Sequence, residues 1–195
     1  MPRYDSETAL LVVDIQNDFA DPAGSLYVRG GEEVLPLVNQ EIQRAGAAGA
    51  MVVYTQDWHP ETTPHFAKDG GIWPVHCVRD TWGAQFHPQL QVEGQVVRKG
   101  TGGEDGYSGF SMRHPTSGDA TPTELEAVLR RGGVSRLVIC GLATDYCVKE
   151  TAIDGLDKGF EVLVLPEAVR AVELEPGDAR RAIEAVRGAG AVIEG

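Results

Sequence analysis

The chain has 195 residues, of which 42% are hydrophobic and 24% charged, a composition typical of a globular domain rather than a disordered chain. Its formal net charge of −12 disfavours nucleic acid as a partner, because nucleic-acid binding needs clustered Lys and Arg side chains. No apolar run approaches the roughly 18 residues that a membrane span requires, so we expect no membrane partner.

The N-terminal segment "MPRYDSETAL" lacks the basic and then apolar pattern of a signal peptide, which favours a cytoplasmic location. After it, short apolar runs alternate with segments of helical period, so we expect strands to alternate with helices. In chain order the expected strands are 8–15, 50–57, 94–100, 135–142 and 160–169, with a short sixth strand at the C-terminus. The expected helices are 32–48, 123–133 and 147–158, with one more in the segment that begins at Pro176.

Strands that alternate with helices indicate βαβ units. We therefore predict an α/β fold of three layers, α/β/α, with a mainly parallel, doubly wound sheet in a single domain over residues 1–195. Segment 58–93 breaks the alternation, since it is irregular and rich in Pro, His, Trp and Gly. A loop of this length inside a compact domain is usually functional.

Four polar or reactive side chains stand where the predicted strands end. Asp14, Asp57 and Lys99 end the first three strands, and Cys147 follows the fourth. Any one of them alone is more typical of a helix cap or a surface charge. In open α/β sheets, however, ligands bind beyond the carboxyl ends of the strands. Four such residues at one sheet edge therefore predict a functional site.

Cys147, in the stretch "CGLATDYCVKET", has four possible roles: a packing residue, half of a disulfide, a metal ligand or a nucleophile. The chain has three cysteines, and the spacing C-x6-C is not usual for zinc, so the disulfide and ligand roles are disfavoured. A helix N-terminus and the ammonium of Lys99 would favour the thiolate. Asp14 could carry the thiol proton, and backbone N–H groups of the turn "GLATDYC" could bind an oxyanion. This combination suits acyl transfer through a cysteine nucleophile.

A second cluster lies in and next to segment 58–93. One carboxylate and three imidazoles form a ligand set that suits zinc, iron or manganese. The residues are Asp57, His59, His65 and His76. Each histidine alone could be an ordinary loop residue, but together they predict a divalent metal site. His87 and His114 each precede a proline and are interpreted as turn residues.

The motifs that carry these residues resemble those of the nicotinamidases, within the isochorismatase-like cysteine hydrolases. They follow the order of that family over nearly the whole chain, and the set is far more specific than any single motif. The motifs are "LLVVDIQNDF" (10–19), "TQDWHP" (55–60), "HF" (65–66), "WPVHC" (73–77), "KG" (99–100), "YSGF" (107–110) and "GLATDYCV" (141–148).

The resemblance implies an amide hydrolase that converts nicotinamide to nicotinate and ammonia in NAD salvage. By position, Asp14, Lys99 and Cys147 would be the catalytic triad, with a thioester formed on Cys147. A cis peptide bond between Leu142 and Ala143 would direct the N–H groups of Ala143 and Cys147 at the oxyanion.

The resemblance also implies a divalent metal, with zinc expected ahead of iron and manganese, whose open positions carry water and the pyridine nitrogen. Its ligands would be Asp57, His59, His65 and His76. Phe19, Trp73 and Tyr107 would line an aromatic slot for the substrate, although aromatic residues at such positions can equally be core residues. Tyr146 stands where some relatives have histidine, which bears on the pocket rim or on substrate preference.

Two other interpretations stay open. Another member of the superfamily could act on isochorismate, a carbamoyl compound or a different amide, and the aspartate and histidine cluster argues against the isochorismate-cleaving branch. A scaffold or metal-binding protein without activity would not need the triad. We expect a small-molecule substrate, and a homo-oligomer is open because exposed faces of such sheets often pair.

Overall fold

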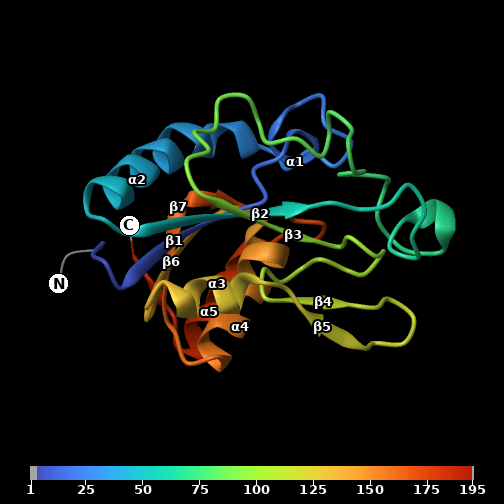
Figure 1. Ribbon diagram of the computed structural model, residues 1–195. Helices are drawn as coiled ribbons and strands as arrows, with labels where there is room; N and C mark the ends of the chain where they lie inside the picture. The colour runs from blue at the N-terminus through green and yellow to red at the C-terminus, as the bar shows by residue number, and fades with distance from the viewer. Residues whose placement is uncertain (1–3, 195) are drawn as a thin grey trace.

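A six-stranded sheet forms the middle layer of the computed structural model, which describes residues 4–194 (Figure 1). Its strand order is β3-β2-β1-β6-β7-β8, and every neighbouring pair is parallel. The strands are β1 (Thr8–Val13), β2 (Met51–Asp57), β3 (Gln95–Lys99), β6 (Arg136–Leu142), β7 (Glu161–Arg170) and β8 (Val192–Ile193). The chain moves outward from β1 to β3, returns to β6 beside β1, and moves outward again to β8. This doubly wound α/β fold confirms the predicted class.

Helices cover both faces of the sheet (Figure 1). On one face lie α1 (Asn17–Ala20) and α2 (Leu35–Ala47); on the other lie α3 (Leu125–Arg131), α4 (Lys149–Asp157) and α5 (Asp178–Ala189). Strand β1 is buried along its whole length and supplies both cores: Leu10 and Val12 pack on the α2 side, Leu11 and Val13 on the opposite side. A strand buried on both faces has no polar alternation, which explains its continuous apolar sequence.

The helix predictions were right in place and differ in detail. A 3₁₀ helix, Gly31–Val34, precedes α2, and Pro36 lies in the first turn of α2, where the N–H that proline lacks has no helical partner. The segment predicted as helix 147–158 begins earlier, with a π-helical turn over Thr144–Val148, so Cys147 lies inside this turn rather than at the first residue of α4.

Short elements escaped the sequence pattern. An antiparallel pair, β4 (Ser111–Arg113) and β5 (Ala120–Pro122), projects beside the main sheet. Each strand has only three residues and none of them is fully buried, so neither an apolar run nor an alternation marks them. The segment 58–93, described throughout, holds one 3₁₀ helix, Ala67–Asp69, and isolated β-bridges such as His59 with Val78.

None of the helices among residues 4–194 has the length and hydropathy that crossing a membrane would require. We propose that the chain is one domain because one continuous sheet contains strands from both ends of the described residues. Residues 1–3 and 195, which the predicted domain includes, lie outside the described residues.

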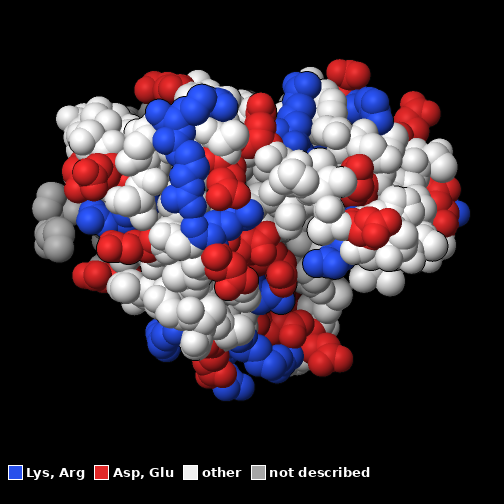
Figure 2. All heavy atoms as spheres, turned by 60° about the horizontal axis from the view of Figure 1, so that its bottom comes forward, with Lys and Arg blue, Asp and Glu red and all other residues white. Residues whose placement is uncertain are grey.

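Surface charge of both signs is mixed on the face that carries α3, α4 and α5. Figure 2 shows Lys and Arg side chains interspersed there with Asp and Glu. One of the ion pairs of these elements joins Lys158 to Glu126, at 2.8 Å. The positive charge of individual residues on this face is therefore offset by neighbouring carboxylates.

Candidate active site

The carboxyl ends of four parallel strands bring the predicted residues together. Asp14 follows β1 directly, with a positive φ of 47°, and Cys147 lies in the turn after β6, the neighbour of β1 at the point where the chain reverses its strand order. Asp57 and Lys99 end β2 and β3 and stand opposite each other in the ladder. All four side chains are buried. This is the place where open α/β sheets bind ligands.

Lys99 is the centre of this cluster. Its Nζ lies 2.7 Å from Asp14 Oδ2 and 2.5 Å from Asp57 Oδ1. It also donates a hydrogen bond to the carbonyl of Gly106 and lies 3.6 Å from the Sγ of Cys147. One fully buried ammonium therefore contacts two carboxylates and the thiol.

The charges of this cluster depend on one another. Burial opposes the charge on Lys99, but attraction by Asp14 and Asp57 outweighs it and raises the pKa of Lys99 well above its usual value. Burial raises the pKa of Asp14, while Lys99 and a 2.7 Å hydrogen bond from Thr55 Oγ1 oppose the rise. Burial acts the same way on Asp57, yet Lys99 and His59 hold the pKa of Asp57 well below its usual range. Asp14 is thus the more basic of the two carboxylates.

The pKa of the Cys147 thiol is shifted in the opposite direction from the one we expected from the sequence. We expected the helix start and Lys99 to favour the thiolate. Burial instead raises the pKa of the Cys147 thiol well above its usual value, and the negative charges of Asp14 and Asp57 add to this, against the opposing effect of Lys99. The Cys147 sulfur and one oxygen each of Asp14 and Asp57 lie within 4.8 Å of one another. The thiol is therefore neutral here and has a carboxylate base beside it.

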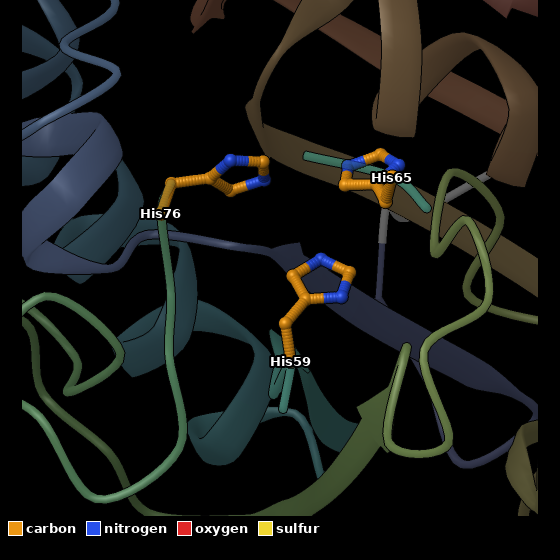
Figure 3. Close-up of side chains that lie close together, drawn as sticks. All are labelled: His59, His65 and His76. Carbon is orange, nitrogen blue, oxygen red and sulfur yellow. The ribbon is translucent and has the colours of Figure 1, made fainter. Parts of the chain in front are cut away.

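The three histidines of the predicted metal cluster form a group of their own. His59 follows β2, whereas His65 and His76 come from the loop after it, and each offers a ring nitrogen within 4.8 Å of the others. Figure 3 shows the three rings converging on one space from different segments. The Asp57 carboxylate lies beside this group, with Oδ2 3.7 Å from His59 Nε2, and its other oxygen contacts Lys99.

The hydrogen bonds of these rings fit a divalent metal. His59 is fully buried, and neither of its ring nitrogens has a hydrogen-bond partner within residues 4–194. His65 Nδ1 lies 2.5 Å from Asp105 Oδ1, and His76 Nδ1 lies 2.8 Å from the carbonyl oxygen of Pro74. Such outer partners orient metal-ligating imidazoles and leave Nε2 for the ion.

The protonation of His76 agrees with this role. Burial and the neighbouring His59 lower the pKa of His76 to about 4, so its ring is neutral at pH 7. A neutral imidazole is the form that binds a metal. His59, fully buried and without a hydrogen-bond partner among the described residues, lies next to this neutral ring, and the two together suit a bound cation.

A pocket lies between Cys147 and two of the clustered histidines, His65 and His76. The three predicted slot residues, Phe19, Trp73 and Tyr107, all line it. Trp73 Nε1 donates a 2.7 Å hydrogen bond to the Tyr107 hydroxyl, and the Tyr146 ring packs edge-on against Trp73 at a centroid distance of 4.8 Å. Part of the pocket wall is therefore aromatic, and contacts among Trp73, Tyr107 and Tyr146 hold the orientations of these rings.

The predicted oxyanion residues also reach the pocket. Ala143 and Cys147 both line it, and the peptide bond between Leu142 and Ala143 is cis, as the resemblance implies. The N–H of Val148 bonds to the carbonyl of Ala143 at 3.0 Å, which closes the π-helical turn around the cysteine. Backbone N–H groups of this turn are thus close to the space beside the Cys147 sulfur.

A family model of the isochorismatase domain matches residues 8–194 of the chain, which is nearly its whole length. The chain belongs to the isochorismatase family.

Several amide hydrolases are similar to this chain. It is 36% identical to the nicotinamidase of Escherichia coli (strain K12), over 95% of this chain and 93% of that protein. A structure of Pyrococcus horikoshii pyrazinamidase in complex with zinc is 42% identical, with a TM-score of 0.85 over 96% of this chain and 98% of that one. A structure of PnC1 from L. infantum in complex with nicotinate is 35% identical, with a TM-score of 0.87 over 98% and 94%.

Several residues of this isochorismatase-family site were not found by sequence reasoning. Asp105, which contacts His65, stands in the glycine-rich stretch after β3, and its only signal is an acidic residue near a strand end. Thr55 lies two residues before Asp57 in β2, and nothing in the sequence distinguishes it from an ordinary strand residue. Gly106 contributes a carbonyl oxygen, which no side-chain pattern can reveal.

Proposed function

We propose that this protein is a nicotinamidase, which hydrolyses nicotinamide to nicotinate and ammonia. The observation that carries the proposal is one pocket whose wall holds aromatic rings, two of the three clustered histidines and Cys147. The pocket suits a flat ring that carries one amide group, and the similarity to nicotinamidases supports the same assignment. A pyrazine carboxamide has the same shape, so we propose it as a second substrate.

The proposed reaction starts with the neutral thiol of Cys147. Asp14 takes the thiol proton while the sulfur attacks the amide carbon, and the negative charge that develops on the oxygen is bound by the N–H groups of Ala143 and Cys147. Asp14 then gives this proton to the departing nitrogen, which leaves as ammonia, and a thioester remains. Water then attacks the thioester and gives one proton to Asp14, which passes it to the sulfur as the thioester bond breaks and so restores the Cys147 thiol. The acid that forms loses its remaining proton to solvent and is released as nicotinate. Lys99 keeps Asp14 ionised until the proton moves.

We propose a divalent metal, zinc, whose ligands would be Asp57, His59, His65 and His76. Such an ion supplies a Lewis acid that can bind the pyridine nitrogen of the substrate. The protein's own contribution is to orient these ligands through Asp105 and the Pro74 carbonyl, and to place the ring between Phe19, Trp73 and Tyr107. The zinc complex of the related pyrazinamidase supports the choice of metal.

The cellular setting follows from the reaction. Nicotinamide hydrolysis belongs to NAD salvage, and three buried, free cysteines suit a reducing compartment. We therefore propose a cytoplasmic location. The oligomeric state stays a prediction, which sedimentation of the purified protein would test.

Ammonia release from nicotinamide tests the proposal, with metal content measured in the same samples. Wild-type protein should release ammonia, whereas Cys147→Ala should lose activity by a factor of about 10³ or more and keep its metal. Metal bound without activity in the wild type would refute the substrate and direct the search to other amides. Equal activity in both proteins would refute the nucleophile.

A further inference from the structure

The end of β1 leaves the neighbouring strand without a partner. The β1–β2 ladder stops at the pair Val13 and Thr55, because Asp14 takes a positive φ and turns the chain away. Strand β2 continues to Asp57. On one side β2 pairs with β3, where Asp57 stands opposite Lys99. On the β1 side, the backbone N–H and carbonyl of Asp57 point to a place that the strand no longer reaches.

A side chain occupies this place. The Asp57 N–H donates to Gln16 Oε1 at 2.8 Å, and Gln16 Nε2 donates to the Asp57 carbonyl oxygen at 2.7 Å. Gln16 Nε2 gives its second hydrogen to the carbonyl of Ala84 at 2.9 Å. Gln16 is fully buried, so two donors and one acceptor are all used without water. The carboxamide thus takes the place of two backbone groups of β1, one carbonyl and one N–H, that would otherwise bond to the Asp57 backbone.

The residue held in this way joins the two halves of the site. Asp57 Oδ1 lies 2.5 Å from Lys99 Nζ, and Asp57 Oδ2 lies 3.7 Å from His59 Nε2. His59 is only two residues further along the chain. A rotation or shift of the Asp57 backbone would therefore move the carboxylate away from Lys99, from the histidines, or from both.

We propose that Gln16 is a positioning residue whose carboxamide replaces the missing stretch of β1 and fixes Asp57 between Lys99 and the metal-ligating histidines. Its effect on metal binding rests on the proposed metal site. Its effect on catalysis rests on the proposed nicotinamidase function. Gln16 contacts neither substrate nor metal in this proposal and acts only through Asp57.

The chain supplies a matched control in Gln56. This glutamine is also buried and donates to the same carbonyl, that of Ala84, at 2.9 Å. Its Oε1 accepts from Arg98 Nε at 3.1 Å, and both residues line a separate groove that shares no residue with the pocket beside Cys147. Gln56→Leu thus removes a buried carboxamide and a bond to Ala84, as Gln16→Leu does, but leaves the two bonds to the Asp57 backbone in place.

The experiment compares the zinc affinities of wild type, Gln16→Leu and Gln56→Leu by competition with a chromophoric chelator, beside their urea-unfolding midpoints. Outer partners of metal ligands change metal affinity by about 10–100-fold, so we expect a loss of that size in Gln16→Leu and less than about threefold in Gln56→Leu. We expect both variants to be less stable than wild type. Wild-type zinc affinity in Gln16→Leu, or an equal loss in Gln56→Leu, would overturn the proposal.

Gln16→Glu provides the same test if Gln16→Leu does not fold. The carboxylate keeps the acceptor for the Asp57 N–H but cannot donate to the Asp57 carbonyl, so we expect its zinc affinity to fall as well. Wild-type affinity in this variant would also overturn the proposal. Absence of nicotinamide hydrolysis in the wild type would refute the proposed function only, since the comparison of zinc affinities needs no substrate.

Discussion

Replacement of Lys99 by methionine tests whether the buried ammonium is what keeps two carboxylates inside the protein. Methionine has a similar length and no charge, so the change removes the cation and keeps most of the packing. In the wild type, Lys99 Nζ lies 2.7 Å from Asp14 and 2.5 Å from Asp57, and both carboxylates are buried. The variant leaves two negative charges next to each other with no cation between them.

The expected loss is large on the scale of a domain. Removing one partner of a buried ion pair typically costs about 3–5 kcal/mol, because the other charge is left without compensation. Lys99 serves two carboxylates, so we expect a loss of unfolding free energy in the upper part of that range, about 4–5 kcal/mol. A domain has about 5–15 kcal/mol in total, so the variant should fold but lie close to its limit.

The assay is urea unfolding at pH 7, followed by circular dichroism with a chelator present so that bound metal does not contribute. The double variant Lys99→Met with Asp14→Asn should regain about 2 kcal/mol, because it removes one of the two uncompensated charges. Lys158→Met is the surface control: it breaks a 2.8 Å pair with Glu126 that water solvates, and should change stability only slightly.

A loss below about 1 kcal/mol in Lys99→Met would refute the reasoning, since it would mean that water or a rearranged donor replaces the ammonium at little cost. A double variant less stable than Lys99→Met would refute it as well. In that case Asp14 would be needed for its own hydrogen bonds, such as the one from Thr55, and repulsion between the carboxylates would not be the dominant effect.

Three further predictions concern the residue that contacts His65 and two glycines. Asp105→Ala should weaken zinc binding about 10–100-fold in chelator competition, because the 2.5 Å contact that orients His65 is lost; an unchanged affinity would make that contact incidental. Gly141→Ala should lose at least about 2 kcal/mol in urea unfolding, since φ is +113° and a Cβ would lie 2.1 Å from the Val13 carbonyl oxygen. Gly46→Ala should instead raise the unfolding free energy by about 0.5–1 kcal/mol, because Gly46 lies in α2 and nothing is within 4 Å of the new Cβ. A loss of stability there would mean that the added methyl group is not accommodated.

The fold could be predicted from the sequence because most strands of the central sheet contain a short apolar run bounded by polar residues. Strand β1 is the clearest case, since burial on both faces demands apolar side chains at every position. The β4–β5 pair could not be predicted, because three-residue strands with exposed side chains owe their conformation to neighbouring segments.

The candidate site divides in a similar way. Asp14, Asp57, Lys99 and Cys147 were predictable as a group because parallel strands deliver their carboxyl ends to one edge. For Cys147 the sequence indicated that Lys99 lowers the pKa of the thiol, which it does, but it did not reveal the burial that raises this pKa by more. Burial is a property of the whole packed structure, and no local pattern reports it.

By itself the sequence determined the class of fold and the polar or reactive residue that follows or ends each of four strands. It also determined which residue types are available as nucleophile, proton carrier and metal ligands. Periodicity and spacing along one chain are enough for these. Only the tertiary structure decided which atoms meet: Asp105 with His65, the Gly106 carbonyl with Lys99, and the Gln16 carboxamide with the Asp57 backbone. These contacts join segments about 40 residues apart, or pair a side chain with a backbone group. They therefore depend on where the strands stop and how the loops close over them.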